Sequence, residues 1–149
     1  MPLIALLPRI LLIEDDAGRI ESFTRWLAGT EFVLVVARSG GQALGMLAKG
    51  STEAVAGILL DHDLSDSPLT QTDSLLSASN VIPLIQRRVR PSVPVLIHSH
   101  NTSKPVRMQR ALEATGFSVT RIRFATLAQS DVLFGQWLQD VRVNWDPED

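Results

Sequence analysis

The sequence predicts one α/β domain with a three-layer, doubly wound sheet of parallel strands. Two observations predict this class. Short apolar runs rich in β-branched residues recur along the chain, and a helix-like segment follows each of them. These runs are continuously apolar, as expected for strands that helices cover on both faces. A chain of 149 residues, with 45% hydrophobic and 20% charged side chains, suits a single globular domain.

Five apolar runs are the predicted strands. They span residues 10–13, 32–36, 55–60, 93–97 and, more weakly, 119–124. Five helices are predicted between and after them. The first helix has a cap at Asp16 and a stop at Gly29, and the second begins with a capping box of Ser39 and Gln42. The third spans residues 81–90 with Pro83 in its first turn, and the fourth lies between Ser103 and Gly116. The last is marked by an apolar stripe of Leu133, Trp137 and Val141.

Alternating strands and helices imply right-handed crossovers and a flavodoxin-like sheet with strand order 2-1-3-4-5. Ligands of such sheets bind beyond the carboxyl ends of the strands. We expect one domain over residues 1–149 with a core of about 8–142. The Ser-, Thr- and Asp-rich stretch 65–79 is a predicted mobile loop beside that edge, and residues 144–149 are a predicted frayed tail.

Acidic residues follow the first strand directly, as Glu14-Asp15-Asp16. Adjacent carboxylates repel each other unless a cation offsets them, and oxygen ligands suit Mg²⁺ or Mn²⁺. The alternative for Asp16 is that it caps its helix. The cluster therefore indicates a divalent cation site.

The third strand leads into Asp61-His62-Asp63 and the fourth into His98-Ser99-His100-Asn101, so that all three histidines follow strands that end at the predicted ligand edge. With strand alternation, Asp61 and Asp63 share a face. Two chemistries fit: imidazoles and carboxylates as metal ligands, or histidine as general acid or base beside a bound phosphate. Lys104, in the first turn of the next predicted helix, and Arg123, ending the fifth strand, are candidate phosphate ligands.

Composition narrows the function classes. The net charge of −2 disfavours non-specific binding of nucleic acid, and no DNA-binding module is evident. The absence of cysteine excludes disulfides and thiolate metal sites. The apolar residues 1–7 are too few for a signal or membrane segment, and we expect a cytoplasmic protein without a membrane partner. Residues 80–124 carry eight basic side chains and one acidic one, which either hold an anion or solvate helices.

Over residues 8–142 the sequence resembles receiver domains of two-component signalling. The run from Ile10 to Asp16 resembles their first strand with its metal-binding acidic pair, here Glu14 and Asp15, and Leu59-Leu60-Asp61 resembles the strand that ends in the phospho-accepting aspartate. Ser99 stands at the position of a phosphoryl-binding Ser or Thr. The family's Lys-Pro after the fifth strand is replaced by Arg123-Phe124, which puts ordinary phosphorylation in doubt.

The histidine motifs resemble a divergent, cyclic-phosphate-processing branch of receiver-like domains. The motifs are Leu60-Asp61-His62-Asp63-Leu64 and His98-Ser99-His100-Asn101, and Arg19 stands where this branch carries an arginine. The resemblance implies binding or hydrolysis of a cyclic phosphate or phosphodiester. The expected catalytic residues are Asp61, His62, His98 and His100; the phosphate ligands are Ser99, Asn101, Lys104, Arg123 and Arg19; the ligands of Mg²⁺ or Mn²⁺ are Glu14, Asp15, Asp61 and Asp63.

Three functions follow from these expectations. The first is a metal-dependent phosphoesterase acting on a small phosphorylated ligand or cyclic-phosphate end. The second is a single-domain response regulator phosphorylated on Asp61 that signals to a protein partner. The third is an inactive pseudo-receiver that binds proteins, with Trp26, Trp137 and Trp145 as candidate contacts. A homodimer through the last two helix–strand units is a further expectation by analogy.

Overall fold

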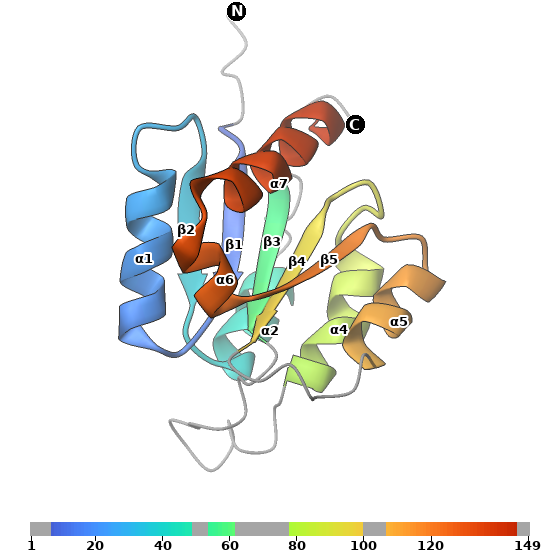
Figure 1. Ribbon diagram of the computed structural model, residues 1–149. Coiled ribbons are helices and arrows are strands. Elements are labelled where there is room, and N and C mark those ends of the chain that lie inside the picture. Colours follow the sequence, from blue (N-terminus) through green and yellow to red (C-terminus); the bar gives the residue numbers. More distant parts are fainter. Residues whose placement is uncertain (1–6, 49–53, 62–77, 100–106, 146–149) are drawn as a thin grey trace, which may run out of the picture.

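The computed structural model describes residues 7–48, 54–61, 78–99 and 107–145. Five parallel strands form one sheet in the order β2-β1-β3-β4-β5, which confirms the predicted class and strand order (Figure 1). The strands are β1 (Arg9–Ile13), β2 (Val33–Ala37), β3 (Val55–Asp61), β4 (Val95–Ser99) and β5 (Val119–Arg123).

Six helices occur in the described residues. They are α1 (Ala17–Leu27), α2 (Gly40–Ala48), α4 (Ala78–Arg88), α5 (Arg107–Ala114), α6 (Phe124–Gln129) and α7 (Asp131–Asn144). The sequence predicts five, with Phe124 at the end of the fifth strand and no helix between that strand and the stripe that begins at Leu133. Ser130 separates α6 from α7, and its hydroxyl accepts a hydrogen bond from the Val132 N–H to cap α7.

The helices divide into two layers, one on each face of the sheet. One apolar cluster packs α2, α4 and α5 against the sheet, and the other packs α1, α6 and α7 against the opposite face. In Figure 1, α7 crosses in front of the sheet while α2 lies behind it. Strand residues of alternating position supply the two clusters, so side chains two residues apart on a strand face the same helices.

The local signals of the first two helices are confirmed. Asp16 Oδ2 accepts a hydrogen bond from the Arg19 N–H at 2.8 Å, which caps α1. Ser39 Oγ accepts from the Gln42 N–H at 3.1 Å, while the Gln42 side chain accepts from the Arg38 N–H at 2.7 Å.

The boundaries of α4 and α7 differ from the expected ones. α4 begins at Ala78, so residues 78 and 79 belong to a helix instead of the predicted loop, and Pro83 lies beyond the first turn. Asn144 still belongs to α7, and Trp145 packs against the α1–α7 cluster instead of fraying. Residues 65–77 of the predicted loop and 146–149 of the predicted tail lie outside the described residues.

Close packing of α7 on the middle strand explains one glycine. A Cβ at Gly57 would lie 2.8 Å from Cη2 of Trp137 and 3.1 Å from Cγ2 of Val141. Trp137 is thus a core residue, 3% exposed, rather than the interface contact that a pseudo-receiver would use. The packing holds β3, the strand that ends in Asp61, against α7.

Within the part of the chain that the structure describes, no helix has the length and apolar character needed to span a membrane.

Candidate functional site

Glu14, Asp61 and His98 lie side by side where three neighbouring strands end. Asp61 pairs in register with His98, and Ile13 pairs with Leu60, so Glu14 follows in line with Asp61. All three side chains are fully buried, and each has one potential ligand atom within 4.8 Å of the others. The carboxyl edge of the sheet therefore carries two carboxylates and one imidazole in direct proximity.

Five hydrogen bonds surround the Glu14 carboxylate. Oε1 accepts from Arg19 Nε and from His98 Nε2, both at 2.8 Å. Oε2 accepts from Arg19 Nη2 at 3.1 Å and from the backbone N–H groups of Asp15 and Asp16 at 3.0 and 3.1 Å. A carboxylate has about four lone-pair positions, so its accepting capacity is filled.

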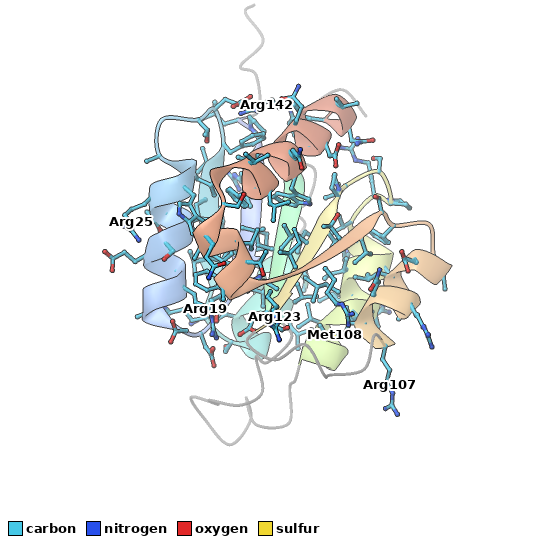
Figure 2. All side chains as sticks on the ribbon, viewed as in Figure 1. Arg19, Arg25, Arg107, Met108, Arg123 and Arg142 are labelled. Carbon is cyan, nitrogen blue, oxygen red and sulfur yellow. The ribbon has the colours of Figure 1, made fainter. Side chains whose placement is uncertain are left out.

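Arg19 supplies the positive charge of this cluster. The capped start of α1 places Arg19 at its third residue, where the side chain turns back over the sheet edge. Its guanidinium bonds Glu14 in a two-pronged fashion, and its Nη2 lies 3.6 Å from Asp61 Oδ2. Figure 2 shows Arg19 at the lower edge of the sheet, where the strands end, and Arg25 of the same helix pointing away from it.

These contacts govern the charges of the pair. Burial alone would raise the pKa of Glu14, but the hydrogen bonds from His98 and Arg19 outweigh burial and hold that pKa far below its usual value. Partial burial would lower the pKa of Arg19, but the hydrogen bond to Glu14 and the charges of Glu14 and Asp61 raise it instead. Glu14 is therefore an anion and Arg19 a cation throughout the physiological range.

Asp15 has the opposite electrostatic environment. Burial, the neighbouring charge of Glu14 and a hydrogen bond with it raise the pKa of Asp15 to about 6. Its Oδ2 is buried without a hydrogen-bond partner among the described residues. The site thus retains unbalanced negative potential at Asp15 even with Arg19 in place.

His98 binds the Glu14 carboxylate through a buried hydrogen bond. Because an ionised carboxylate can only accept, Nε2 of His98 must carry the proton in the 2.8 Å contact. The imidazole packs on the rings of Phe23 and Phe124, with centroids 5.0 and 6.5 Å away. With 0% exposure, His98 orients Glu14 within the protein.

The predicted site residues fall into three groups. Glu14, Asp15, Asp61, His98 and Arg19 form the cluster described above. Ser99 ends β4 and is buried, and it pairs in register with the exposed Arg123 at the end of β5, so Arg123 lies two strands from Asp61. The predicted residues His62, Asp63, His100, Asn101 and Lys104 lie outside the described residues and stay predictions.

Sequence reasoning assigned the helix cap to Asp16, which the structure confirms, but missed how Glu14 and Asp15 divide. Glu14 is buried and saturated, Asp15 is half-buried, and Asp16 is the exposed helix cap. The pairing of Arg19 with Glu14 was also missed, because the resemblance suggested a phosphate ligand. The available signal was an arginine three residues after a helix cap, which places its side chain over the preceding strand end.

The chain is similar in structure to the N-terminal domain of a response regulator/sensory box/GGDEF three-domain protein from Carboxydothermus hydrogenoformans, with TM-score 0.66, 16% identity and coverage of 91% of this chain and 94% of that one. A signal receiver domain of an HD domain-containing protein from Pseudomonas fluorescens Pf-5 is similar with TM-score 0.65 and 17% identity, covering 92% of this chain and 96% of that one. The chemotaxis protein CheY4 of Vibrio cholerae is similar with TM-score 0.64 and 15% identity, covering 91% of this chain and 98% of that one. No protein-family model matches the sequence, and no curated protein sequence matches it. The chain therefore has a receiver-type fold.

Receiver folds imply a divalent cation, and the described residues fit one in part. Among the described residues, Glu14, Asp61 and His98 each have a ligand atom within 4.8 Å of the others, and Asp61 would hold Mg²⁺, which is commonly bound through one or two carboxylates. Asp15, which follows Glu14 and has a buried unbonded oxygen, would supply the second carboxylate. Glu14 does not fit as a direct ligand in this arrangement, because its oxygens are saturated. The cation would neutralise negative charge at the site when bound.

Replacing Asp15 by Asn should raise the free energy of unfolding at pH 7, in chelator-treated buffer, by about 1 kcal/mol after allowance for solvent screening. The folded-state pKa of about 6 exceeds the usual 3.8, so the folded state binds this proton more tightly than the unfolded state. Wild-type stability from this group is present at low pH and lost as the pH rises from 3.8 to about 6.

Urea unfolding at pH 7 and below pH 4 measures the effect, which should vanish at the lower pH. Asp140→Asn, on an exposed position of α7, is the matched control. Equal stabilities of wild type and Asp15→Asn at pH 7 would contradict this description of Asp15.

Proposed function

We propose that this domain is a signalling receiver that accepts a phosphoryl group on Asp61. The observation that carries the proposal is the position of Asp61: it ends the middle strand of a receiver-type sheet, between Glu14 and His98, with Arg19 Nη2 at 3.6 Å. The carboxyl edge of a doubly wound sheet is also where such folds bind ligands.

The chemistry required of Asp61 is simple. One carboxylate oxygen attacks the phosphorus of a small phosphodonor, the bond from phosphorus to the donor's leaving oxygen breaks, and an acyl phosphate forms. The product adds negative charge beside a guanidinium that is permanently protonated and suited to binding phosphate oxygens. Ser99 and Arg123, at the neighbouring strand ends, are the further phosphate ligands in this proposal.

Incubation with acetyl phosphate and Mg²⁺ should add the mass of one phosphoryl group to the intact protein. The added group should be released by hydroxylamine, as an acyl phosphate is, and Asp61→Asn should abolish it while Asp140→Asn should not. Intact mass spectrometry makes the measurement. A phosphoryl group that persists in the Asp61→Asn protein, or none in the wild type at saturating donor, would refute phosphorylation at this residue.

A second candidate is binding or hydrolysis of a cyclic phosphate or phosphodiester. The observation that favours it is the imidazole of His98, hydrogen-bonded to Glu14 inside the same cluster, together with the resemblance of both histidine motifs to the cyclic-phosphate-processing branch. In this reading Asp15 and Asp61 hold the cation, and a proton passes through a histidine of the edge.

Metal-dependent turnover of a 2′,3′-cyclic nucleotide would distinguish this candidate. The wild type should hydrolyse the cyclic nucleotide in the presence of Mn²⁺, and Asp61→Asn should eliminate this activity. Chromatography measures the phosphate monoester that forms. No hydrolysis across the four 2′,3′-cyclic nucleotides, with the ion shown to be bound by calorimetry, would reject the hydrolysis and leave the phosphorylation proposal unaffected.

A further inference from the structure

Glu14 cannot take a divalent ion as a ligand without losing one of its present partners. Its five donors are two nitrogens of Arg19, the Nε2 of His98 and two backbone N–H groups. These fill the accepting capacity of a carboxylate. Recruitment of Glu14 to a metal ion therefore requires that a donor leave.

Arg19 is the donor that can leave. The two N–H groups belong to the turn that enters α1, so their position is fixed by the chain. His98 is fully buried against aromatic rings. The Arg19 side chain is 18% exposed and reaches Glu14 on a flexible stem, so rotation about its own bonds would move it into solvent.

We propose that Arg19 is a built-in counter-ion that competes with the divalent cation for Glu14 and thereby sets the metal affinity of the site. The guanidinium offsets the charge of Glu14 and lies 3.6 Å from Asp61 when no ion is bound, and it cannot release Glu14 by losing its proton. The Arg19 side chain must therefore move away before the ion can bind the Glu14 carboxylate. The inference rests on the proposed function in one respect, since the cation concerned is the one that phosphoryl transfer to Asp61 would use.

Calorimetric titration of the whole chain with Mg²⁺ tests the competition without any phosphodonor. Arg19→Gln should lower the Kd for Mg²⁺ by about tenfold, the size of a typical coupling between two competing ligands. Arg25→Gln is the matched control: it removes the same charge from the same helix, but Arg25 is exposed and bonds Ser22 Oγ at 3.5 Å, away from the cluster. Its Kd should equal that of the wild type.

Three outcomes of this titration overturn the proposal. One is an equal Kd for the wild type and Arg19→Gln; another is an equal decrease in Arg19→Gln and Arg25→Gln, which would show a long-range charge effect. Failure of all three proteins to bind Mg²⁺ would overturn it too, because Arg19 would then compete with nothing.

A second measurement needs no variant and covers the case in which Arg19→Gln does not fold. In nitrogen–proton correlation spectra of the wild type, Mg²⁺ should shift the Arg19 Nε–H resonance as its bond to Glu14 is lost. Saturation of the site, seen at the backbone amides of Asp15 and Asp61, without any change at Arg19 Nε–H would contradict the competition.

The result is separable from that of the proposed function. Tighter Mg²⁺ binding by Arg19→Gln, with no phosphorylation of Asp61 in any protein, would keep the counter-ion role and reject the receiver function. Phosphorylation of Asp61 with unchanged Mg²⁺ affinity would do the reverse.

Discussion

The hydrogen-bonded ion pair between Glu14 and Arg19 is the interaction on which the arrangement of this sheet edge depends. Withdrawing both charges from water costs several kcal/mol per ion, so such a pair is weak evidence for stability. Its consequence is positional: Glu14 is held back from solvent by its five donors, while Asp61 remains beside the guanidinium and Asp15 keeps an unbonded oxygen. Arg19 therefore offsets part of the negative charge at this edge, and an incoming cation or phosphoryl group meets an arginine already in place.

The parallel topology makes this arrangement hard to avoid. Strands β1, β3 and β4 end at the same edge, and the two-residue period sends Glu14, Asp61 and His98 toward the same helices. On that face His98 touches Phe23, which also contacts the ring of Trp26 at 5.1 Å. The site is thus continuous with the aromatic packing between the sheet and helices α1, α6 and α7. If Glu14 exchanged one partner for another, the nearest packing to be affected would be that of His98 on the Phe23 ring.

The fold could be predicted because its signals are local: apolar runs, caps and breakers specify each unit, and few connections are consistent with alternating strands and helices. Helix α6 was missed because it is six residues long and its N-cap residue, Arg123, makes no side-chain cap hydrogen bond. The helix cap at Asp16 was predicted, but the different environments of Glu14 and Asp15 were not, since the sequence alone does not say that the Glu14 side chain is buried while that of Asp15 is half-buried. The pairing of Arg19 depends on one side-chain conformation, which no periodicity encodes.

The most direct test of the account is a crystal structure of the chain with Mn²⁺ and beryllium fluoride, a phosphoryl analogue. The account predicts analogue density on Asp61, an ion bound by Glu14 together with Asp15 and Asp61, and an Arg19 side chain that has left Glu14. Analogue and ion bound at the strand ends with Arg19 still joined to Glu14 would contradict the counter-ion role, and an Asp61 without the analogue at saturating concentration would contradict the account as a whole.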